Sequence, residues 1–339
     1  MAAIDAVAKL TPAKAPENLH IGLVAIRPGT GEVIALYGGK DYLVRQLNDA
    51  TQSIALAGST FKPFALAGAL ESGIPLTSMW NGDTPQVFDD AGKPYEVNNY
   101  GDEGWGQIDL LTATAHSVNT VYVPLGIKVG PDKVVDVARR AGIPDSVAMM
   151  PTPSVVLGAA SPHVIDVASA YATFAAQGVY AQPWFIVEVK GANGGLLYQA
   201  NPPTPQEVFS KDVMADLTYA LQQVVNNGTA TYGTSGLGRP AAGKTGTSEQ
   251  NASAWFSGYT PQLAASVSMF RDDASQTLNG IGGLNSVTGG TFPAKIWTAF
   301  MKGALEGQPK LSFPKAVHIG GTDPVVITSG GKQSIKKKK

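Results

Sequence analysis

The sequence predicts an α+β fold in which helices pack against one antiparallel sheet, with a mainly helical subdomain beside it. Three observations support this fold class. Segments with strand character occur near both ends of the chain, apolar residues at helical spacing fill the middle, and glycine or proline separates most elements. With 339 residues, of which 44% are hydrophobic, the chain is long enough to bury one large core or two modest ones.

Apolar segments on either side of turn signals predict β-hairpins. Residues 21–26 and 32–39 flank the turn sequence RPGTG and form the first predicted hairpin. Two further hairpins have the same form, at 184–190 with 196–200 and at 253–259 with 263–270. We expect hairpins from the two ends of the chain to share the sheet. Residues 80–106, dense in Asn, Asp and Gly, are predicted to be a loop.

Helical spacing of apolar residues predicts the remaining elements, most of them between about 60 and 230. The predicted helices cover residues 60–72, 109–116, from about 120 onward, 131–141, 162–177, 211–227 and 293–305. Several open with proline or a capping residue and end at Gly or Asn, as helices commonly do. The first of them places Ser59 at a helix N-terminus.

Composition excludes several classes of function. Charged residues make up 15% of the chain and the net charge is −1, so we expect no nucleic-acid partner. The absence of cysteine excludes disulfides and thiol catalysis, and the four scattered histidines form no H-E-x-x-H zinc helix. We therefore expect no metal and no cofactor.

The ends of the chain differ in character from its middle. Residues 1–19 are expected to be a linker, 20–306 the folded domain, and 307–339, rich in Gly, Pro, Ser and Lys, a flexible tail. No apolar run reaches the roughly 18 residues that a membrane span needs, and the N-terminus lacks the order of a signal peptide.

The segment GLGRPAAGKTGTS (236–248) fits two motifs. From Gly238 to Thr245 it matches G-x-x-x-x-G-K-[ST], which binds nucleotide phosphates when a buried strand precedes it and a helix follows. Here a glycine-rich loop precedes it and a predicted strand follows, so the nucleotide interpretation fails. From Lys244 the segment also reads K-T-G, one of three elements of a serine acyl-transfer site.

The other two elements occur upstream in the required order. Ser59 and Lys62 form S-x-x-K at the start of a helix, where a spacing of three residues places the hydroxyl and the amine on one face. Ser117 and Asn119 form S-x-N at a helix-to-loop junction. Each motif alone is common, but together they predict a site in which Lys62 acts as a base, provided that burial and a second cation, Lys244, lower its pKa.

These residues and the segments around them resemble the transpeptidase domain of a penicillin-binding protein, in particular the class A, bifunctional kind. The similarity covers roughly residues 20 to 305 and is carried by four segments: 58–73, 98–126, 168–179 and 241–261. Relatives often have Asp just before the Ala-Trp-Phe of the final strand, where this chain has Ser253.

The resemblance implies a D,D-transpeptidase that cross-links peptidoglycan stem peptides and is acylated by β-lactams. Ser59 is then the nucleophile, Lys62 its base, and Ser117 the relay of a proton to the leaving D-alanine. Asn119 holds Lys62 and the substrate, and Lys244 keeps the site electropositive.

The resemblance also implies substrate-binding roles along the K-T-G strand. The backbone N–H groups of Ser59 and Thr247 form the oxyanion hole. Thr245 and Thr247 receive the substrate carboxylate, and Gly246 leaves room for a peptide along the strand edge.

Related activities remain open. A class A β-lactamase needs a deacylating Glu in an E-x-x-x-N stretch between the second and third motifs. Only Glu188 and Glu207 lie there, and neither is followed by Asn four residues on. A D,D-carboxypeptidase or a non-catalytic β-lactam sensor fits the same motifs. We further expect the chain to be a soluble fragment of a membrane-anchored, extracytoplasmic protein with an upstream glycosyltransferase domain.

Overall fold

The computed structural model describes residues 1–273, 275–328 and 331–334, and its centre is a five-stranded antiparallel sheet. The strands, in spatial order, are β11 (Ala242–Thr247), β12 (Ser253–Thr260), β13 (Leu263–Arg271), β1 (Leu19–Ile26) and β2 (Val33–Tyr37). Strand β1 pairs with β13 along its whole length, so the N-terminal and C-terminal hairpins share one sheet, as predicted. Strand β11, which carries the K-T-G sequence, is an edge strand of this sheet.

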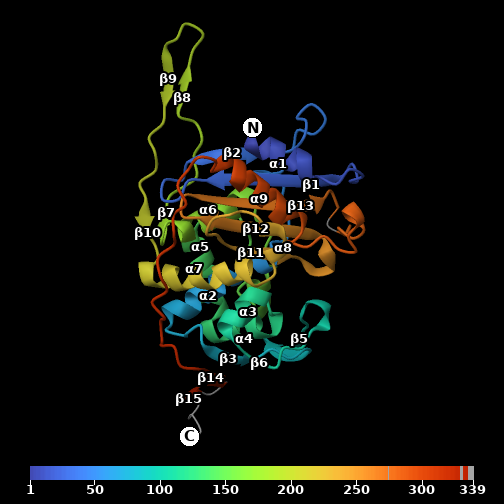
Figure 1. Ribbon diagram of the computed structural model, residues 1–339, viewed down its shortest axis with the longest axis vertical. Coiled ribbons are helices and arrows are strands. Elements are labelled where there is room, and N and C mark those ends of the chain that lie inside the picture. Colours follow the sequence, from blue (N-terminus) through green and yellow to red (C-terminus); the bar gives the residue numbers. More distant parts are fainter. Residues whose placement is uncertain (274, 329–330, 335–339) are drawn as a thin grey trace.

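Helices cover both faces of the sheet (Figure 1). Consecutive residues of a strand point to opposite faces, and two neighbours on β12 show which helix covers each face. A side chain at Gly258 would meet Trp297 of α9 (Phe292–Ala304), whereas the ring of Tyr259 meets Tyr171 of α6 (Val164–Ala175). The α+β class with flanking helices is therefore confirmed.

Helix α2 (Lys62–Glu71) is almost entirely buried and is preceded by a 3₁₀ turn, η1 (Gly58–Phe61). Every residue of α2 from Lys62 to Leu70 is buried. Three helices surround it: α4 (Asn119–Val129), α5 (Pro131–Ala141) and α7 (Lys211–Asn226). A helix that is buried on every side belongs to the core, so Lys62, the first residue of α2, is built into the interior of the fold.

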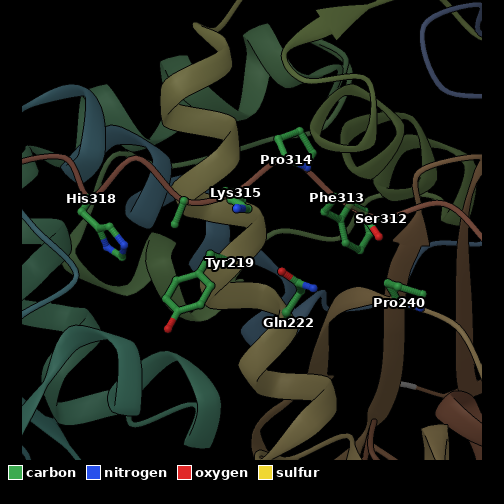
Figure 2. A pocket seen from close by; sticks show the side chains of 9 residues that line it. Tyr219, Gln222, Pro240, Ser312, Phe313, Pro314, Lys315 and His318 are labelled. Carbon is green, nitrogen blue, oxygen red and sulfur yellow. The ribbon is translucent and has the colours of Figure 1, made fainter.

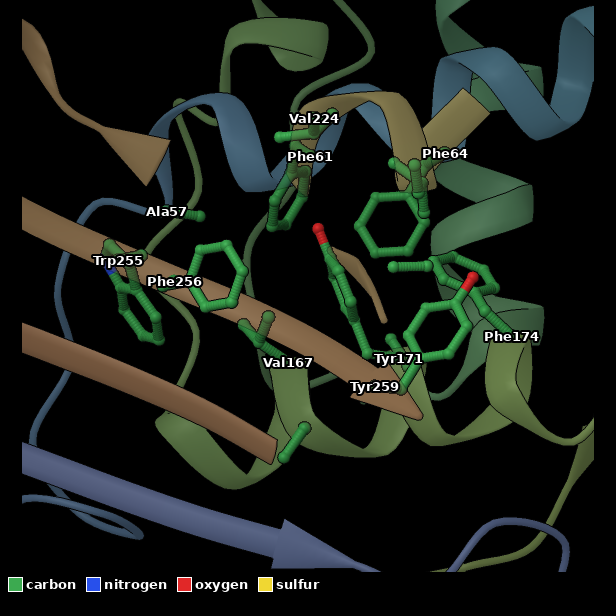
Figure 3. Packing of buried hydrophobic residues seen from close by; sticks show 14 of the residues in the cluster. Ala57, Phe61, Phe64, Val167, Tyr171, Phe174, Val224, Trp255, Phe256 and Tyr259 are labelled. Atoms are coloured by element: carbon green, nitrogen blue, oxygen red, sulfur yellow. The ribbon is translucent and has the colours of Figure 1, made fainter. Parts of the chain in front are cut away.

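An aromatic cluster joins α2 and η1 to the sheet through α6 (Figure 3). Its rings pack edge-on or tilted, with centroids between 5.0 and 6.5 Å apart, and belong to Phe61, Phe64, Tyr171, Phe174 and Tyr259. The Tyr171 hydroxyl donates a hydrogen bond of 2.9 Å to the carbonyl of Thr60. In this dry setting the bond fixes η1 relative to α6 and the sheet.

The region from 80 to 106, which the sequence analysis predicts to be a loop, contains short strands. β3 (Ser78–Asn81) overlaps the start of this region, β4 (Gln86–Asp90) and β5 (Lys93–Val97) lie within it, and β6 (Gln107–Asp109) follows it directly. β4 and β5 form a hairpin, and β6 leads into α3 (Leu110–His116). The loop prediction is wrong because these strands are short and half-exposed, so polar residues occupy positions that a buried strand would fill with apolar ones.

Two further pairs of antiparallel strands lie between α6 and α7 in the sequence. β7 (Val179–Tyr180) pairs with β10 (Gln206–Glu207), and between them the hairpin of β8 (Glu188–Lys190) and β9 (Leu196–Gln199) projects away from the body (Figure 1). The predicted hairpin exists, but β8 is shorter than expected because Trp184 instead bridges to Glu32, beside β2.

The N-terminal segment is part of the folded domain, whereas the sequence analysis expects a linker over residues 1–19. Helix α1 (Ala2–Leu10) packs against α9 and buries Ala3, Ala6 and Val7. These residues recur every three or four positions, which is the spacing of one helix face. The linker prediction is wrong because this spacing indicates a helix, although the segment is otherwise rich in alanine and lysine.

The segment after α9 is docked along the body and pairs with a strand, which corrects the expectation of a flexible tail from residue 307. Asp216 of α7, fully buried, accepts hydrogen bonds of 2.7 to 3.0 Å from the backbone N–H groups of residues 317, 318 and 319. Further on, β14 (Val325–Thr328) pairs in parallel with β3 and antiparallel with β15 (Gly331–Ser334). The last lysines of the chain, 336–339, lie outside the described residues.

A shallow pocket of about 440 Å³ lies between this segment and α7 (Figure 2). It is lined by Tyr219, Gln222, Pro240, His318 and residues 312–316. The segment after α9 is held by the buried carboxylate of Asp216 and by the pairing of β14 with β3. Its content of Gly, Pro and Ser gives no sign of these interactions.

Candidate active site

Ser59 stands on η1, at the point where the chain enters the buried helix α2. Gly58 adopts a φ of +56°, and its N–H donates to the carbonyl of Gly158 at 3.2 Å. Residues three apart in a 3₁₀ turn lie one above the other, so Ser59 and Lys62 project from the same side of η1. The Lys62 N–H donates to the Ser59 carbonyl. Ser59 is half-buried, whereas Thr60 and Phe61 beside it are fully buried.

Lys62 is fully buried and makes three hydrogen bonds to the S-x-N motif. Its Nζ donates to the Ser117 carbonyl at 2.6 Å, to Ser117 Oγ at 3.1 Å and to Asn119 Oδ1 at 2.6 Å. The structure thus joins the first two motifs through one amine.

Lys244 on the edge strand β11 is also fully buried and reaches the same hydroxyl. Its Nζ donates to Ser117 Oγ at 2.7 Å and to the carbonyl of Thr245 at 3.2 Å. Ser117 Oγ therefore lies between the two amines, and the three motifs, which are far apart in sequence, meet at this atom.

The two lysines have lowered pKa values because they are buried close together. Burial lowers the pKa of Lys62 well below its ordinary value, and repulsion from Lys244 lowers it further. Burial also lowers the pKa of Lys244 to about 7. Within the described residues no carboxylate forms an ion pair with either amine. The site can therefore hold a neutral amine at position 62 beside a cation at position 244, the combination that activates a hydroxyl.

The backbone around Ser117 explains how one hydroxyl reaches both lysines. Ser117 ends α3 in the left-handed conformation (φ 60°, ψ 38°), which is uncommon for a residue other than glycine. Its N–H remains bonded to the last turn of α3, and the next N–H, of Val118, donates to the carbonyl of Ala113. This cap turns the chain sharply into α4 and directs the Ser117 side chain toward β11.

Asn119 is held at the start of α4 from a second direction. Its Nδ2 donates to the carbonyl of Asn98 at 2.8 Å, so its Oδ1 is oriented toward Lys62. The neighbouring Asn99 accepts hydrogen bonds from the N–H and the hydroxyl of Thr120, both at 3.1 Å. The asparagines that follow β5 therefore anchor the second motif, a role that the sequence analysis did not assign to them.

Strand β11 lies directly against η1, and two glycines make this approach possible. A Cβ on Gly58 would lie 2.7 Å from the Thr247 carbonyl oxygen and 2.9 Å from its nitrogen. A Cβ on Gly246 would lie 2.5 Å from the carbonyl oxygen of Ala57. The missing side chain of Gly246 thus faces the turn that carries Ser59. From the sequence, Gly246 is expected to leave room for a peptide, but the close contact that requires glycine is with the turn before and within η1.

Thr245 and Thr247 lie on the opposite face of β11 from Lys244, and each hydroxyl already has one partner. Thr245 Oγ1 is 2.7 Å from Thr229 Oγ1, and Thr247 Oγ1 accepts a hydrogen bond of 3.3 Å from the N–H of Gly289. Because a hydroxyl combines one donor with two acceptor sites, Thr247 retains its proton for a further partner.

A protein-family model matches most of the chain, in agreement with the order and geometry of these three motifs. Residues 21–272 match the family model described as the penicillin-binding protein transpeptidase domain. The chain belongs to this family. It is therefore an acyltransferase of the penicillin-binding transpeptidase type, and the resemblance found in the sequence is confirmed.

Known relatives of this transpeptidase domain come from several bacteria. The chain is 34% identical to penicillin-binding protein 1A of Mycolicibacterium smegmatis and 35% identical to that of Mycobacterium tuberculosis. The two alignments each cover 94% of this chain but only 42% and 40% of the relatives, so the chain spans less than half of their length. The structure superposes with a TM-score of 0.84 on PonA1 of M. tuberculosis in complex with penicillin V, at 34% identity, covering 95% of this chain and 87% of the other.

Ser253, at the position where the family resemblance led us to expect Asp, makes a polar contact of its own. Its hydroxyl donates to the carbonyl of Leu56 at 2.5 Å, and the Trp255 indole N–H donates to the same oxygen at 2.8 Å. Serine therefore supplies a polar contact here, and it ties β12 to the chain three residues before Ser59.

Two residues near the transpeptidase site carry no motif signal. Tyr122, three residues after Asn119 on α4, places its buried ring 5.3 Å from Lys62 Nζ, and its hydroxyl lies 2.7 Å from Thr114 Oγ1. Thr229 lies in a loop between α7 and α8 (Thr231–Thr234). Helical spacing from Asn119 places Tyr122 on the same face of α4, but the sequence contains no comparable signal for Thr229.

In the described part of the chain, no helix combines the length and the apolar character needed to cross a bilayer.

Proposed function

We propose that this domain is a D,D-transpeptidase that acts on D-Ala-D-Ala stem peptides through an acyl-enzyme on Ser59. The observation that supports this most directly is the meeting of two buried lysines at Ser117 Oγ, beside the turn that carries Ser59. Neither lysine is paired with a carboxylate in the part of the chain that the structure describes. A serine hydroxyl is a weak nucleophile without a base, and a lysine becomes a base at neutral pH only when its pKa is lowered in this way.

In the first half of the reaction, Lys62 takes the Ser59 proton as Ser59 Oγ attacks the carbonyl carbon of the penultimate D-alanine. The tetrahedral intermediate collapses, the bond to the terminal D-alanine nitrogen breaks, and Ser117 delivers a proton to that nitrogen. Ser117 is placed for this step because its hydroxyl contacts Lys62, which then holds the proton taken from Ser59, so the proton lost by Ser117 can be replaced.

In the second half, the amine of another stem peptide attacks the ester carbonyl of the acyl-enzyme. The bond to Ser59 Oγ breaks, the oxygen regains a proton, and an amide cross-link forms. In both halves the N–H groups of Ser59 and Thr247 stabilise the oxyanion. Removing one such donor typically raises the activation free energy by about 2.7–4 kcal/mol. Their proximity is supported by the contact of β11 with η1 at Gly58.

The terminal carboxylate of the donor peptide is received by the hydroxyls of Thr245 and Thr247, while Lys244, on the other face of β11, keeps the site electropositive. A β-lactam presents a carboxylate and a strained amide to the same groups, so we propose that it acylates Ser59 and is released slowly. A relative at 34% identity was solved in complex with penicillin V. Because the curated relatives are more than twice as long, we further propose that the domain works at the outer face of a bacterial membrane, joined to a glycosyltransferase domain.

The test uses the purified domain, a donor peptide ending in D-Ala-D-Ala or its thioester analogue, and an acceptor amine. We expect release of D-alanine together with a new amide to the acceptor, and neither product from Ser59→Ala. Hydrolysed donor without amide would instead assign a carboxypeptidase, and a single acylation without turnover would assign a sensor. Equal D-alanine release by Ser59→Ala would contradict the proposed nucleophile.

A further inference from the structure

The hydroxyl of Thr229 pairs with that of Thr245 at the rim of the site. Thr245 is 6% exposed, whereas Thr229 is an exposed residue, and the two Oγ1 atoms are 2.7 Å apart. The pair therefore lies between the buried strand β11 and the solvent, where a substrate would approach Thr245.

The backbone of Thr229 is fixed on both sides by close contacts. Its N–H donates to the carbonyl of Ala115, two residues before Ser117, and its carbonyl oxygen lies 2.1 Å from the place of a Cβ on Gly290. A Cβ on Gly228 would lie 2.1 Å from the Ala115 carbonyl oxygen, so this turn is wedged against the last turn of α3. The Thr229 hydroxyl is consequently presented to Thr245 by a rigid frame that also carries Ser117.

The two hydroxyls share two protons, of which one lies in the bond between them. If Thr229 is the donor, the Thr245 proton is free to point toward an anion, and the oxygen that carries it is polarised by the bond it accepts. Without the Thr229 hydroxyl, the Thr245 hydroxyl loses this partner, and its proton is free to rotate.

We propose that Thr229 is a positioning residue whose hydroxyl orients the Thr245 proton toward the carboxylate of the donor peptide or the β-lactam. The inference deepens the proposed function and rests on it. The ligand class is a carboxylate anion, because a hydroxyl directed in this way adds a charge-assisted hydrogen bond only when the ligand is negatively charged.

The test is a double-mutant cycle between the Thr229 hydroxyl and the ligand carboxylate. The second-order rate constant of acylation is measured with benzylpenicillin and with its methyl ester, for wild type, Thr229→Val and Thr229→Ser. We expect Thr229→Val to slow acylation by benzylpenicillin about tenfold, the order expected for one charge-assisted hydrogen bond, and to leave the ester within about twofold of wild type. Thr229→Ser, which keeps the hydroxyl, restores the rate.

Thr231→Val is the matched control. Thr231, the first residue of α8, is also exposed, but its hydroxyl donates to the Gly228 carbonyl at 2.9 Å and not to the site. We expect this variant to react with both compounds in the wild-type ratio.

An equal loss with benzylpenicillin and ester in Thr229→Val, or no loss with either, would overturn the proposal. Failure of the proposed function has a different signature, because wild type would then form no adduct at Ser59 with benzylpenicillin. Since Thr229 is exposed, we expect the melting temperature of Thr229→Val to stay close to that of wild type.

Discussion

Removing the cation at position 244 tests how the site activates its base. In Lys244→Gln the repulsion that helps to lower the pKa of Lys62 disappears, while the burial of Lys62 remains. The pKa of Lys62 therefore rises, and a smaller fraction of this amine is neutral at a given acidic pH. We expect the acid limb of the acylation rate to move to higher pH.

The size of the effect follows from the geometry. Both Nζ atoms lie within 3.1 Å of Ser117 Oγ, so they are no more than about 6 Å apart. Two unit charges at that separation repel by roughly 3 kcal/mol at an effective dielectric constant of about 20, which corresponds to about a hundredfold in a protonation equilibrium. On the acid limb we expect acylation by Lys244→Gln to fall by up to about a hundredfold from this cause alone.

The assay is the second-order rate constant of acylation by a β-lactam from about pH 4 to about pH 10, a range that brackets the pKa of Lys244, about 7. Lys244→Arg is the control, because arginine keeps the charge and leaves the acid limb in place. In wild type the pKa of Lys244, about 7, adds an alkaline limb as that amine loses its proton, and Lys244→Arg removes this limb. An acid limb of Lys244→Gln at or below that of wild type would refute the reasoning.

Three further predictions concern the frame of the site. Gly58→Ala introduces a Cβ 2.7 Å from the Thr247 carbonyl oxygen at a position where φ is +56°. We therefore expect the free energy of unfolding to fall by roughly 2 kcal/mol or more and acylation to be lost. An unchanged melting temperature would contradict the close packing of η1 against β11. Asp216→Ala removes the acceptor for three backbone N–H groups, so we expect new proteolytic cleavage within residues 312–322 while acylation continues; a wild-type cleavage pattern would show that the carboxylate does not hold this segment. Lys244→Met removes a buried amine whose pKa is about 7 in the folded protein, against an ordinary value of 10.5 that it regains on unfolding. Between these two values the unfolded chain binds more protons, so burying the charged amine destabilises the folded protein most below pH 7 and less as the pH rises toward 10.5. The melting temperature of Lys244→Met should therefore exceed that of wild type most below pH 7, by an amount that shrinks toward pH 10.5. A difference in melting temperature that does not change with pH would contradict this explanation.

Periodicity and motif order predicted much of this molecule. Helix α5 has the predicted bounds, Pro131–Ala141, because proline and glycine mark its ends. The sheet was predicted because its strands are apolar runs on either side of clear turns. Lys62, Ser117 and Lys244 could be grouped because each lies in a short motif whose residue types suit one chemistry.

The features that could not be predicted from the sequence depend on contacts between residues that are far apart along the chain. The docking of residues 317–319 depends on a single carboxylate, Asp216, about a hundred residues earlier. The short strands β3 to β6 are half-exposed, so neither the strand period nor the helix period stands out. Thr229 is one hydroxyl in a glycine-rich loop, and its partner, Thr245, is known only once β11 and that loop are placed side by side.

Intact-mass spectrometry after incubation with penicillin, for wild type and Ser59→Ala, measures the central claim most directly. If Ser59 is the nucleophile that Lys62 activates, wild type gains the mass of one penicillin and Ser59→Ala gains none. An adduct of the same mass on Ser59→Ala would contradict the account.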